Sequence, residues 1–375
     1  MGTKKKYLDW LFILPTDSLG GGAEQLQFNL VQHLISTRKT CHVIIITQKK
    51  RHTWAKLESD FLNITYIPVK NWYLGYLLLP CYILKLKFRY RIKKIFTSQT
   101  LINGLVGFLK KIRFIERNTT IITRESNTIY KLISGKKLKL YDLAYKLGYP
   151  HVNLIICQTD YMKKELIKSI SKVLEHKNVI TIPNPINIEE NNQRSEEFKP
   201  ETDKYIIAAG RLVHVKGFDV LIDAFKMIEQ EIPDHKLIIL GEGYLRNDLQ
   251  EQINNYNLQD RIILHGFVNN VYPYFKNASL CVLSSRIEGF PNVLLQMMSQ
   301  NERIVSTLSA GDIKDIEGIY TCETESKDLL AHNILNCLKD GSDHKRTLFD
   351  TYLSKRTVDS FIAEVESQIS KPLRQ

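Results

Sequence analysis

The sequence is poor in cysteine and contains no long apolar run. Its 375 residues include six cysteines, at positions 41, 81, 157, 281, 322 and 337. No pair has the spacing of a metal-binding motif, and scattered thiols of this kind are typical of a reducing cytosol. No stretch reaches the ~18 uninterrupted apolar residues that a membrane span needs. The apolar run after the basic start is broken by Asp9, so we interpret it as a buried strand and not as a signal peptide. These absences favour a cytosolic protein.

Acidic residues are scarce in the first half of the chain. Residues 1–190 contain 31 Lys and Arg but only 13 Asp and Glu, whereas the remainder contains 21 and 27, so the net charge of +12 comes from the first half. A basic half indicates an anionic partner, which can be nucleic acid, an anionic membrane surface or a phosphorylated substrate. Because no nucleic-acid-binding motif accompanies the charge, we do not expect a nucleic-acid partner.

Short β-branched runs alternate with amphipathic helical segments in both halves. Strands are expected at 42–47, 120–123 and 153–159, and then at “YIIAAG”, “KLIILG”, “RIILHG”, “LCVLSS” and “RIVST”. Continuous apolar runs are typical of parallel strands covered by helices on both faces, so each half is predicted to be an α/β layer structure. Residues 183–204, rich in Asn, Glu and Pro, are the best candidate for a linker between the halves.

A glycine-rich loop follows the first expected strand. Gly20, Gly21 and Gly22 allow positive φ and a close approach of backbone amides to a ligand, and the helix expected from about Ala23 directs its positive end to the same place. Such a loop can hold a phosphate or a sugar. A flexible strand-to-helix turn explains the same glycines without a ligand.

Two cations follow the first strand of the second half. After Gly210, Arg211 and Lys216 lie in a loop before an amphipathic helix. Open α/β sheets bind ligands at the carboxyl ends of their strands, and two cations there suit a diphosphate. The “GEG” turn that ends at Gly243 is a weak signal, because the third glycine of the dinucleotide fingerprint is missing. On their own, these residues also fit a solvated loop and a simple turn.

The segment “SSRIEGFPNVLLQMM”, residues 284–298, places an acid just before a helix. Gly289 and Pro291 indicate that a helix begins directly after Glu288. Glu288 would then lie on the loop, and Gln296 about one turn into the helix. The apolar residues between them are expected in the core.

Taken in order, these motifs resemble one family. “GGAE”, “GRLVHVKGFDVLIDAF”, “GEG”, “HGFV”, “SSRIEGFPNVLLQMM” and the Asn184-Pro185 pair are similar to the motifs of retaining family 4 glycosyltransferases, also described as glycosyl transferases group 1. The resemblance covers most of the chain and implies the GT-B fold, in which two Rossmann-like domains with parallel sheets face a central cleft. It implies an acceptor-side domain at 1–185, a nucleotide-sugar-binding domain at 186–355 and a helix at 356–375 that packs back towards the first domain.

The resemblance also assigns roles to residues. It implies catalytic roles for Glu288, Arg211 and Lys216, with the two cations on the donor diphosphate and no bound metal or other cofactor. Fixed cations are suited to this role, since the leaving diphosphate gains negative charge in the transition state. The donor-binding set that it implies is Gly210, Arg211, Lys216, Gly243, Glu288, Gly289, Phe290, Pro291, Asn292 and Gln296. The acceptor and phosphate loop set is Gly20, Gly21, Gly22, Glu24, Arg124 and Glu125.

One position, Gln296, departs from the family pattern, and the acceptor side leaves a second question open. Gln296 stands where the family usually has a second glutamate that binds the ribose hydroxyls; an amide oxygen still accepts a hydrogen bond, so we expect weaker donor binding in an active enzyme. Arg124 and Glu125 follow a central strand of the first half, and the sequence leaves open whether they reach the active site or only close the end of the strand.

Residues 76–96 combine apolar, aromatic and basic side chains with no acid. Such a segment can lie on an anionic bilayer, although a helix with one buried and one solvated face has the same composition. The expected function is therefore transfer of a hexose or N-acetylhexosamine, with a UDP-sugar as expected donor, to a lipid-linked or growing bacterial surface glycan such as an O-antigen or capsule. The expected location is the inner face of the cytoplasmic membrane. A sugar-nucleotide epimerase, a phosphorylase and a catalytically silent or polyanion-binding module remain alternatives.

Overall fold

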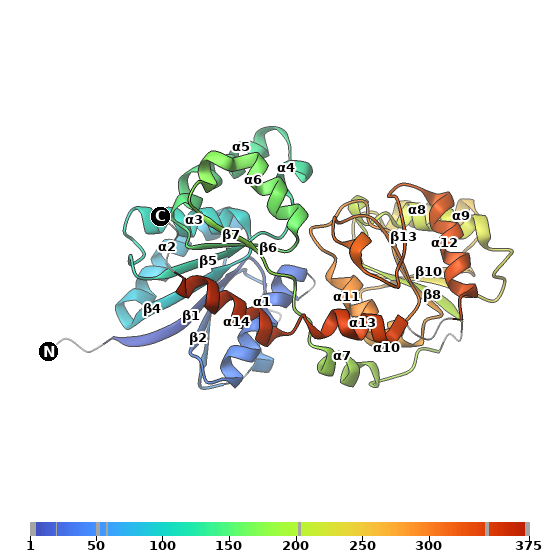
Figure 1. Ribbon diagram of the computed structural model, residues 1–375, viewed down its shortest axis with the longest axis horizontal. Coiled ribbons are helices and arrows are strands. Elements are labelled where there is room, and N and C mark those ends of the chain that lie inside the picture. Colours follow the sequence, from blue (N-terminus) through green and yellow to red (C-terminus); the bar gives the residue numbers. More distant parts are fainter. Residues whose placement is uncertain are drawn as a thin grey trace. The chain divides into compact units, whose positions relative to one another are not determined.

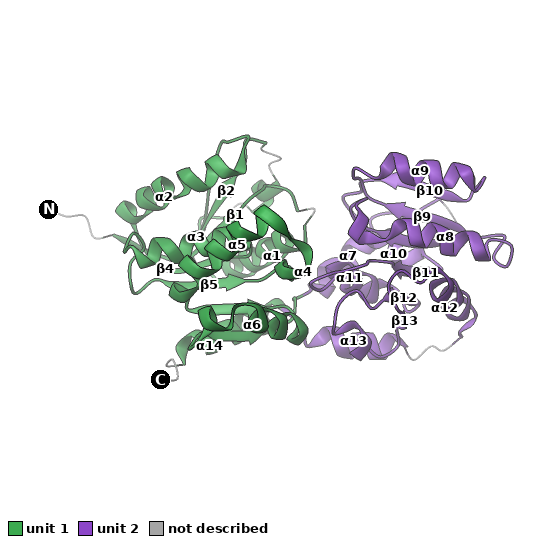
Figure 2. Ribbon diagram, turned by 90° about the horizontal axis from the view of Figure 1, so that it is seen from above, with its two compact units in different colours: residues 1–185, 358–375 green, residues 186–357 purple. Residues whose placement is uncertain are grey.

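The chain divides into two compact units, each built around one parallel sheet (Figure 2). The computed structural model describes residues 5–19, 21–49, 53–57, 59–201, 204–341 and 345–371. Unit 1 comprises Met1–Pro185 and Val358–Gln375, and unit 2 comprises Ile186–Thr357. Both units have helices on both faces of the sheet (Figure 1), as the continuous apolar runs predict.

Unit 1 contains a seven-stranded sheet with the order β3-β2-β1-β4-β5-β6-β7. All neighbouring strands in it run parallel. The strands are β1 (Lys6–Leu14), β2 (Cys41–Ile46), β3 (Leu62–Ile67), β4 (Tyr90–Thr97), β5 (Thr120–Arg124), β6 (Leu154–Cys157) and β7 (Asn178–Thr181). The strands expected near residues 6–14, 42–47, 120–123 and 153–159 are confirmed.

Two apolar cores lie on the two faces of this sheet, because successive strand residues point to opposite sides. Ile95 belongs to the core under α2, α3 and α6, whereas Phe96 belongs to the core that α1 and α14 complete. The helices of unit 1 are α1 (Gly22–Ser36), η1 (Thr53–Leu57), α2 (Trp72–Arg89), α3 (Thr100–Lys111), α4 (Ile129–Leu132), α5 (Gly135–Gly148), η2 (Tyr149–His151), α6 (Asp160–Leu174) and α14 (Val358–Ser370).

Helix α14 belongs to unit 1 although the whole of unit 2 precedes it in the chain. It buries Val358, Phe361 and Val365 in the same core as α1, and Lys94 of β4 pairs with Glu366 at 2.5 Å. At the edge of unit 2, the Ile186 amide donates to the Arg356 carbonyl at 2.7 Å. The first and last parts of unit 2 are therefore joined by a backbone hydrogen bond.

Unit 2 contains a six-stranded parallel sheet with the order β10-β9-β8-β11-β12-β13. Its strands are β8 (Tyr205–Ala209), β9 (Lys236–Leu240), β10 (Ile262–Gly266), β11 (Leu280–Leu283), β12 (Ile304–Thr307) and β13 (Tyr320–Cys322). The five strands expected in this half are confirmed. The helices are α7 (Ile188–Ser195), η3 (His214–Lys216), α8 (Phe218–Ile228), α9 (Arg246–Asn255), α10 (Tyr272–Asn277), α11 (Asn292–Gln300), η4 (Ile313–Asp315), α12 (Lys327–Lys339) and α13 (Lys345–Ser354).

The basic segment 76–96 is not one surface element. Helix α2 ends at Arg89, and β4 continues from Tyr90 as a central strand between β1 and β5. The interpretation of residues 90–96 as part of a membrane-lying segment is therefore wrong, because they form a strand that pairs with β1 from Tyr90 on and with β5 from Lys94 on. Within the described residues, no helix has the length and apolar character required to cross a membrane.

The segment expected to be a linker is partly helical. Residues 188–195 form α7, whose Asn187 side chain accepts a hydrogen bond from the Glu190 amide as an N-cap. Asn191 is buried and donates to Ser299 of α11 at 3.3 Å. The low apolar content of this segment therefore reflects a short helix held to unit 2 largely through polar contacts.

Candidate functional site

The strand order of unit 2 predicts where a ligand can bind, namely at the carboxyl ends of its strands. In unit 2, the connection after β8 leads to β9 on one side, and β11 is the neighbour on the other side. A crevice forms at such a switch point, because the loops from the two neighbouring strands separate. The loops in question are residues 210–217 and 284–291, which contain most of the donor-site residues expected from the sequence.

Lys216 and Glu288 meet at this edge of unit 2. The Lys216 Nζ lies 2.5 Å from Oε1 of Glu288, and the two side chains are 17% and 16% exposed. The Ser285 hydroxyl donates to the same carboxylate oxygen at 2.8 Å. Among the described residues, Oε2 of Glu288 has no hydrogen-bond partner. The pair therefore presents a cation for an anionic group and a free carboxylate oxygen for a hydroxyl.

Two glycines allow the loops after β8 and β9 to pack closely. A side chain at Gly243 would place its Cβ 2.2 Å from the Leu212 carbonyl oxygen, so the loop after β9 can lie against the loop after β8 only without one. At Gly210, a Cβ would lie 3.4 Å from Cδ and Cε of Lys216. The Lys216 side chain thus lies over Gly210 on its way to Glu288.

The loop that contains Glu288 leads directly into α11. Gly289 and Phe290 are buried, Pro291 is the N-cap residue, and Asn292 is the first residue of the helix. Phe290 is anchored in the apolar core, with the Arg356 guanidinium over its ring at 5.0 Å. The positive end of α11 therefore lies next to Glu288, where it favours an anionic group.

Gln296 lies one turn further along α11 and is held by a tyrosine. Its Nε2 donates to the Tyr272 hydroxyl at 3.2 Å, and the Tyr272 ring is buried with the Arg194 guanidinium over it at 5.0 Å. Within the described part of the chain, Oε1 of Gln296 has no partner. The contact with Tyr272 orients the amide and leaves its oxygen available as an acceptor.

Arg211 is the most accessible of the expected donor-site residues. Its side chain is exposed, and it makes no hydrogen bond or ion pair with any residue that the structure describes. The structure thus brings Gly210, Lys216 and Glu288 together and leaves Arg211 free at the same loop.

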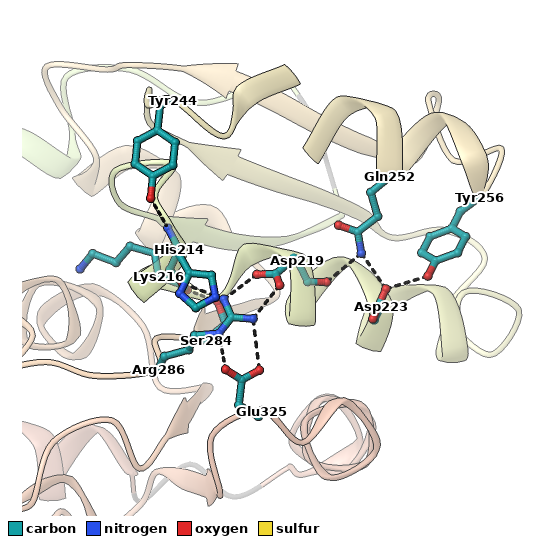
Figure 3. A network of polar contacts seen from close by, with 10 residues as sticks. All are labelled: His214, Lys216, Asp219, Asp223, Tyr244, Gln252, Tyr256, Ser284, Arg286 and Glu325. Carbon is teal, nitrogen blue, oxygen red and sulfur yellow. Dashed lines mark hydrogen bonds and ion pairs between the residues drawn. The ribbon is translucent and has the colours of Figure 1, made fainter. Parts of the chain in front are cut away.

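Arg286, which was not among the residues expected from the sequence, also lies at this site. Figure 3 shows its guanidinium between Asp219 at the start of α8 and Glu325 in the loop after β13. Arg286 lies two residues before Glu288, and this proximity to the motif is the only sequence signal for it. No pattern in the sequence connects Glu325 to the site.

The glycine-rich loop of unit 1 differs from the expectation. Gly21 has φ of −111° as the N-cap residue of α1, Gly22 is the first residue of the helix, and Gly20 lies outside the described residues. Neither described glycine has a positive φ, so the left-handed backbone that glycine allows is not used at Gly21 or Gly22. A Cβ at Gly21 would lie 2.2 Å from the Glu24 carboxylate, which means that Glu24 folds back over the N-terminus of its own helix.

Arg124 and Glu125 lie inside unit 1, each only 1% exposed. Arg124 donates to Asn184 at 2.5 Å and to Ser126 at 3.0 Å, and burial lowers the pKa of Arg124 to about 10, an effect that the charge of Glu24 opposes. Glu125 accepts hydrogen bonds from Tyr149, Tyr145, Asn103 and Thr100, and burial raises the pKa of its carboxyl. The Glu125 carboxylate and both terminal nitrogens of Arg124 bind protein groups, while Nε of Arg124 has no partner among the described residues, and these contacts favour the role of closing the strand end.

The described residues contain no group of three or more His, Cys, Asp and Glu side chains placed to hold a metal ion. The cations of this edge of unit 2 are side chains, namely Lys216, Arg211 and Arg286.

The second unit is similar in sequence to known glycosyltransferases. Residues 189–351 match the family described as Glycosyl transferases group 1. An uncharacterized glycosyltransferase of Methanocaldococcus jannaschii is 38% identical over 213 residues, which are 54% of this chain and 51% of that protein. The N-acetylgalactosamine-N,N'-diacetylbacillosaminyl-diphospho-undecaprenol 4-alpha-N-acetylgalactosaminyltransferase of Campylobacter jejuni is 27% identical, over 80% of this chain and 81% of that protein. The chain thus spans about half the length of the archaeal relative.

The fold of the whole chain is shared with solved structures. Anabaena HepE in complex with UDP has a TM-score of 0.76 at 16% identity, with 96% of this chain and 99% of that chain covered. At this identity the likeness shows the fold alone. The family match and the glycosyltransferase relatives, together with this fold, lead to one conclusion: residues 189–351 of the second unit are similar to the group 1 glycosyl transferases, and the two Rossmann-like units have the GT-B fold.

Proposed function

We propose that this chain is a retaining glycosyltransferase that moves a hexose or N-acetylhexosamine from a nucleotide sugar to a lipid-linked or growing bacterial surface glycan. The observation that carries the proposal is the Lys216–Glu288 pair at the switch point of unit 2, within the region that matches the family. In this proposal Lys216 and Arg211 bind the donor diphosphate, and the free oxygen of Glu288 accepts a hydrogen bond from a sugar hydroxyl. No bound metal or other cofactor is part of the proposal.

The expected donor is a UDP-sugar, and the expected acceptor is linked to a lipid diphosphate. The Campylobacter relative is named for transfer to a diphospho-undecaprenol saccharide, and the HepE structure contains UDP. Two fixed cations on the departing diphosphate stabilise the charge that grows as the glycosidic bond breaks. The departing phosphate oxygen can then take the proton of the acceptor hydroxyl on the same face, so retention needs no separate histidine base.

A donor screen tests the proposal directly. Thermal unfolding is measured with UDP-, GDP- and ADP-sugars, and we expect one nucleotide class to raise the melting temperature. With that donor, release of the nucleoside diphosphate should require a lipid-linked acceptor, and the product should keep the anomeric configuration of the donor. Failure of every nucleotide to stabilise the protein would rule the proposal out, whereas donor turnover without acceptor would point to an epimerase.

Gln296 provides a narrower test of the donor site. The change Gln296→Glu is expected to tighten donor binding by up to about tenfold, because a carboxylate adds a charge-assisted hydrogen bond to a ribose hydroxyl worth about 1 kcal/mol. Tyr272 can accommodate the change, since its hydroxyl can donate to a carboxylate as readily as it accepts from the amide. Calorimetric titration with the nucleotide measures the dissociation constant. Gln300→Glu, on the same helix but bonded to Asn192, is the matched control, and equal constants for Gln296→Glu and wild type would contradict the ribose role.

An exposed face of α2 supports a peripheral position on a membrane. Five exposed apolar residues follow helical spacing, and two of them, Leu77 and Phe88, are 75% and 72% exposed. We call this the α2 face; it consists of Leu74, Leu77, Cys81, Leu84 and Phe88. Lys85 and Arg89 are exposed on the same helix, and the sequence has no acid between Asp60 and Glu116. We include in the proposal that the α2 face lies on the anionic inner surface of the cytoplasmic membrane.

The double change Leu77→Glu and Phe88→Glu tests the α2 face. We expect binding to vesicles that contain phosphatidylglycerol to fall by at least about tenfold, because two apolar groups no longer enter the bilayer and two negative charges are added. Co-sedimentation with the vesicles measures binding. Met227→Glu, at a residue 49% exposed on α8 of unit 2, is the control. If the wild type binds neutral phosphatidylcholine vesicles as well as anionic ones, the α2 face does not recognise an anionic membrane. If the double substitution leaves binding unchanged, the α2 face is not the membrane-binding surface.

A further inference from the structure

The segment from Ser284 to Arg286 binds three successive carbonyl groups of the turn that contains Lys216. The His214 carbonyl accepts from Nη1 of Arg286 at 2.7 Å, the Val215 carbonyl from the Arg286 amide at 2.8 Å, and the Lys216 carbonyl from the Ser284 hydroxyl at 2.9 Å. The whole of η3 is therefore hydrogen-bonded to the loop that contains Glu288.

The Arg286 guanidinium uses all of its five N–H donors. Nη1 and Nη2 donate to the two carboxylate oxygens of Asp219 at 2.7 and 2.6 Å, and Nη1 also donates to His214. Nε and Nη2 donate to Glu325, the latter at 3.1 Å. The Arg286 side chain is 12% exposed, and its hydrogen bonds to Asp219 and Glu325 raise the pKa of Arg286 above its ordinary value. Because its N–H donors all make hydrogen bonds and point to both sides, Arg286 holds His214, Asp219 and Glu325 in fixed positions around it.

Two backbone features accompany this arrangement, a strained conformation at Glu325 and a close backbone contact at Gly217. Glu325 has φ of +64°, a left-handed conformation that a residue with a side chain adopts rarely. Such conformations persist where the surroundings determine them, and here Arg286 binds the Glu325 carboxylate. Gly217 has φ of +61°, and a Cβ at this position would lie 2.2 Å from the Ser284 carbonyl oxygen. The two loops thus touch through backbone with no room for a side chain.

We propose that Arg286 is a positioning residue that holds the turn of Lys216 against the loop of Glu288 and so sets where the Lys216 ammonium meets the donor diphosphate. Lys216 and Glu288 lie on different loops, so their separation depends on what ties the loops together. Arg286 reaches both sides, since it lies on the second loop and binds His214 and Asp219 of the first segment. Glu325 holds the far side of the guanidinium and prevents it from turning away.

This inference rests on the proposed function, and a double-mutant cycle tests the connection between Arg286 and Lys216. Arg286→Ala is expected to lower kcat/KM by about 10- to 100-fold, because a small misplacement of a reacting group has an effect of that size. Once Lys216 is alanine, removing Arg286 should cost little more, so the double variant should match Lys216→Ala within about threefold. Arg286→Lys, which retains the charge but not the fork of donors, should recover thermal stability more than kcat/KM.

Arg261→Ala provides the matched control. This arginine also binds backbone carbonyls of unit 2, those of Ile232 and His235. It directly precedes β10, so it lies at the amino ends of the strands, away from Lys216. Its loss should lower stability, and any effect on kcat/KM should multiply with that of Lys216→Ala. If the effects of Arg286→Ala and Lys216→Ala on kcat/KM also multiply in the double variant, Arg286 acts only through general stability, and the proposal is wrong.

Hydrogen exchange separates failure of this inference from failure of the proposed function. In Arg286→Ala, peptides that cover residues 213–219 should exchange faster than in wild type, whereas peptides from β9 should not change. Arg261→Ala should leave residues 213–219 as protected as in wild type. This measurement needs no donor, so faster exchange without nucleotide binding by the wild type would overturn the enzyme assignment alone. Unchanged exchange in Arg286→Ala would overturn the role of Arg286.

Discussion

Alanine in place of Lys216 is expected to lower transfer activity by about 10²- to 10³-fold, the effect of removing one preorganised charge donor from the transition state. The ammonium is already in place before a ligand binds, since Lys216 lies over Gly210 and pairs with Glu288 at 2.5 Å. The departing diphosphate therefore meets a fixed cation, and water does not have to reorganise around it. Initial rates at saturating acceptor, together with the donor dissociation constant from calorimetry, measure the effect.

The comparison variants make the Lys216 result specific. Lys226→Ala removes another lysine of unit 2, one that pairs with Glu229 three residues on, and should leave the rate within about twofold of wild type. Lys216→Arg retains a cation of different shape and should recover part of the loss. A Lys216→Ala enzyme with a rate within threefold of wild type would show that the diphosphate is stabilised elsewhere, and Arg211 would become the principal candidate.

Replacement of Glu125 by alanine is expected to lower the free energy of unfolding of unit 1 by about 3–5 kcal/mol, because buried donors are left without an acceptor and a cavity opens. The carboxylate accepts from the Tyr145 hydroxyl at 2.9 Å and from the Asn103 amide at 3.3 Å, with Tyr149 and Thr100 as further donors. Glu125→Gln should cost about 1 kcal/mol, since the hydroxyls of Tyr145 and Thr100 can turn to accept from the new amide.

Tryptophan fluorescence measures this loss in the correct unit. All three tryptophans, Trp10, Trp54 and Trp72, lie in unit 1, so a urea titration followed by their emission reports the unfolding of that unit. If Glu125→Gln keeps kcat and Glu125→Ala shifts the unfolding midpoint strongly, Glu125 is structural. A Glu125→Gln protein of wild-type stability with greatly reduced kcat would instead place Glu125 in the reaction.

The pH dependence of the same titration has a defined sign. Burial raises the pKa of Glu125 in the folded protein above its unfolded value of about 4.3. A group with a raised folded pKa contributes stability below the unfolded value, and this contribution is lost as the pH rises through the folded value. The unfolding free energy of wild type relative to Glu125→Gln should therefore fall as the pH rises from about 4.3 through the raised pKa, and then remain constant.

Local sequence patterns predicted most of the strands, but not β3, β4, β7 and β13, and they predicted the loop positions of Lys216 and Glu288. Runs such as “HVIIIT” and “KLIILG” are apolar without interruption, so only strands buried on both faces suit them, and β2 and β9 confirm this. The loop positions of Lys216 and Glu288 followed from glycine and proline punctuation, and the strand order brings these loops together. Their contact was predictable because neighbouring parallel strands end at the same edge.

Long-range features could not be predicted from local patterns. The division of residues 76–96 between α2 and β4 depends on pairing with β1 and β5, which the composition of the segment does not encode. The burial of Arg124 and Glu125 depends on Tyr145 and Asn184, which are distant in the sequence. Glu325 reaches Arg286 from the loop after β13, and no spacing rule connects them.

Unit 2 is in effect a domain inserted into unit 1 between Pro185 and Val358. The hydrogen bond between Ile186 and Arg356 brings the two ends of the insert to a single point. Because its two ends are adjacent, unit 2 can be replaced by another domain without moving the parts of unit 1 that flank it. Unit 1 meanwhile keeps α14 in its core through Phe361. Under the proposed function, in which unit 2 binds the donor and unit 1 the acceptor, donor preference can therefore change by replacement of one continuous gene segment while unit 1 remains the same.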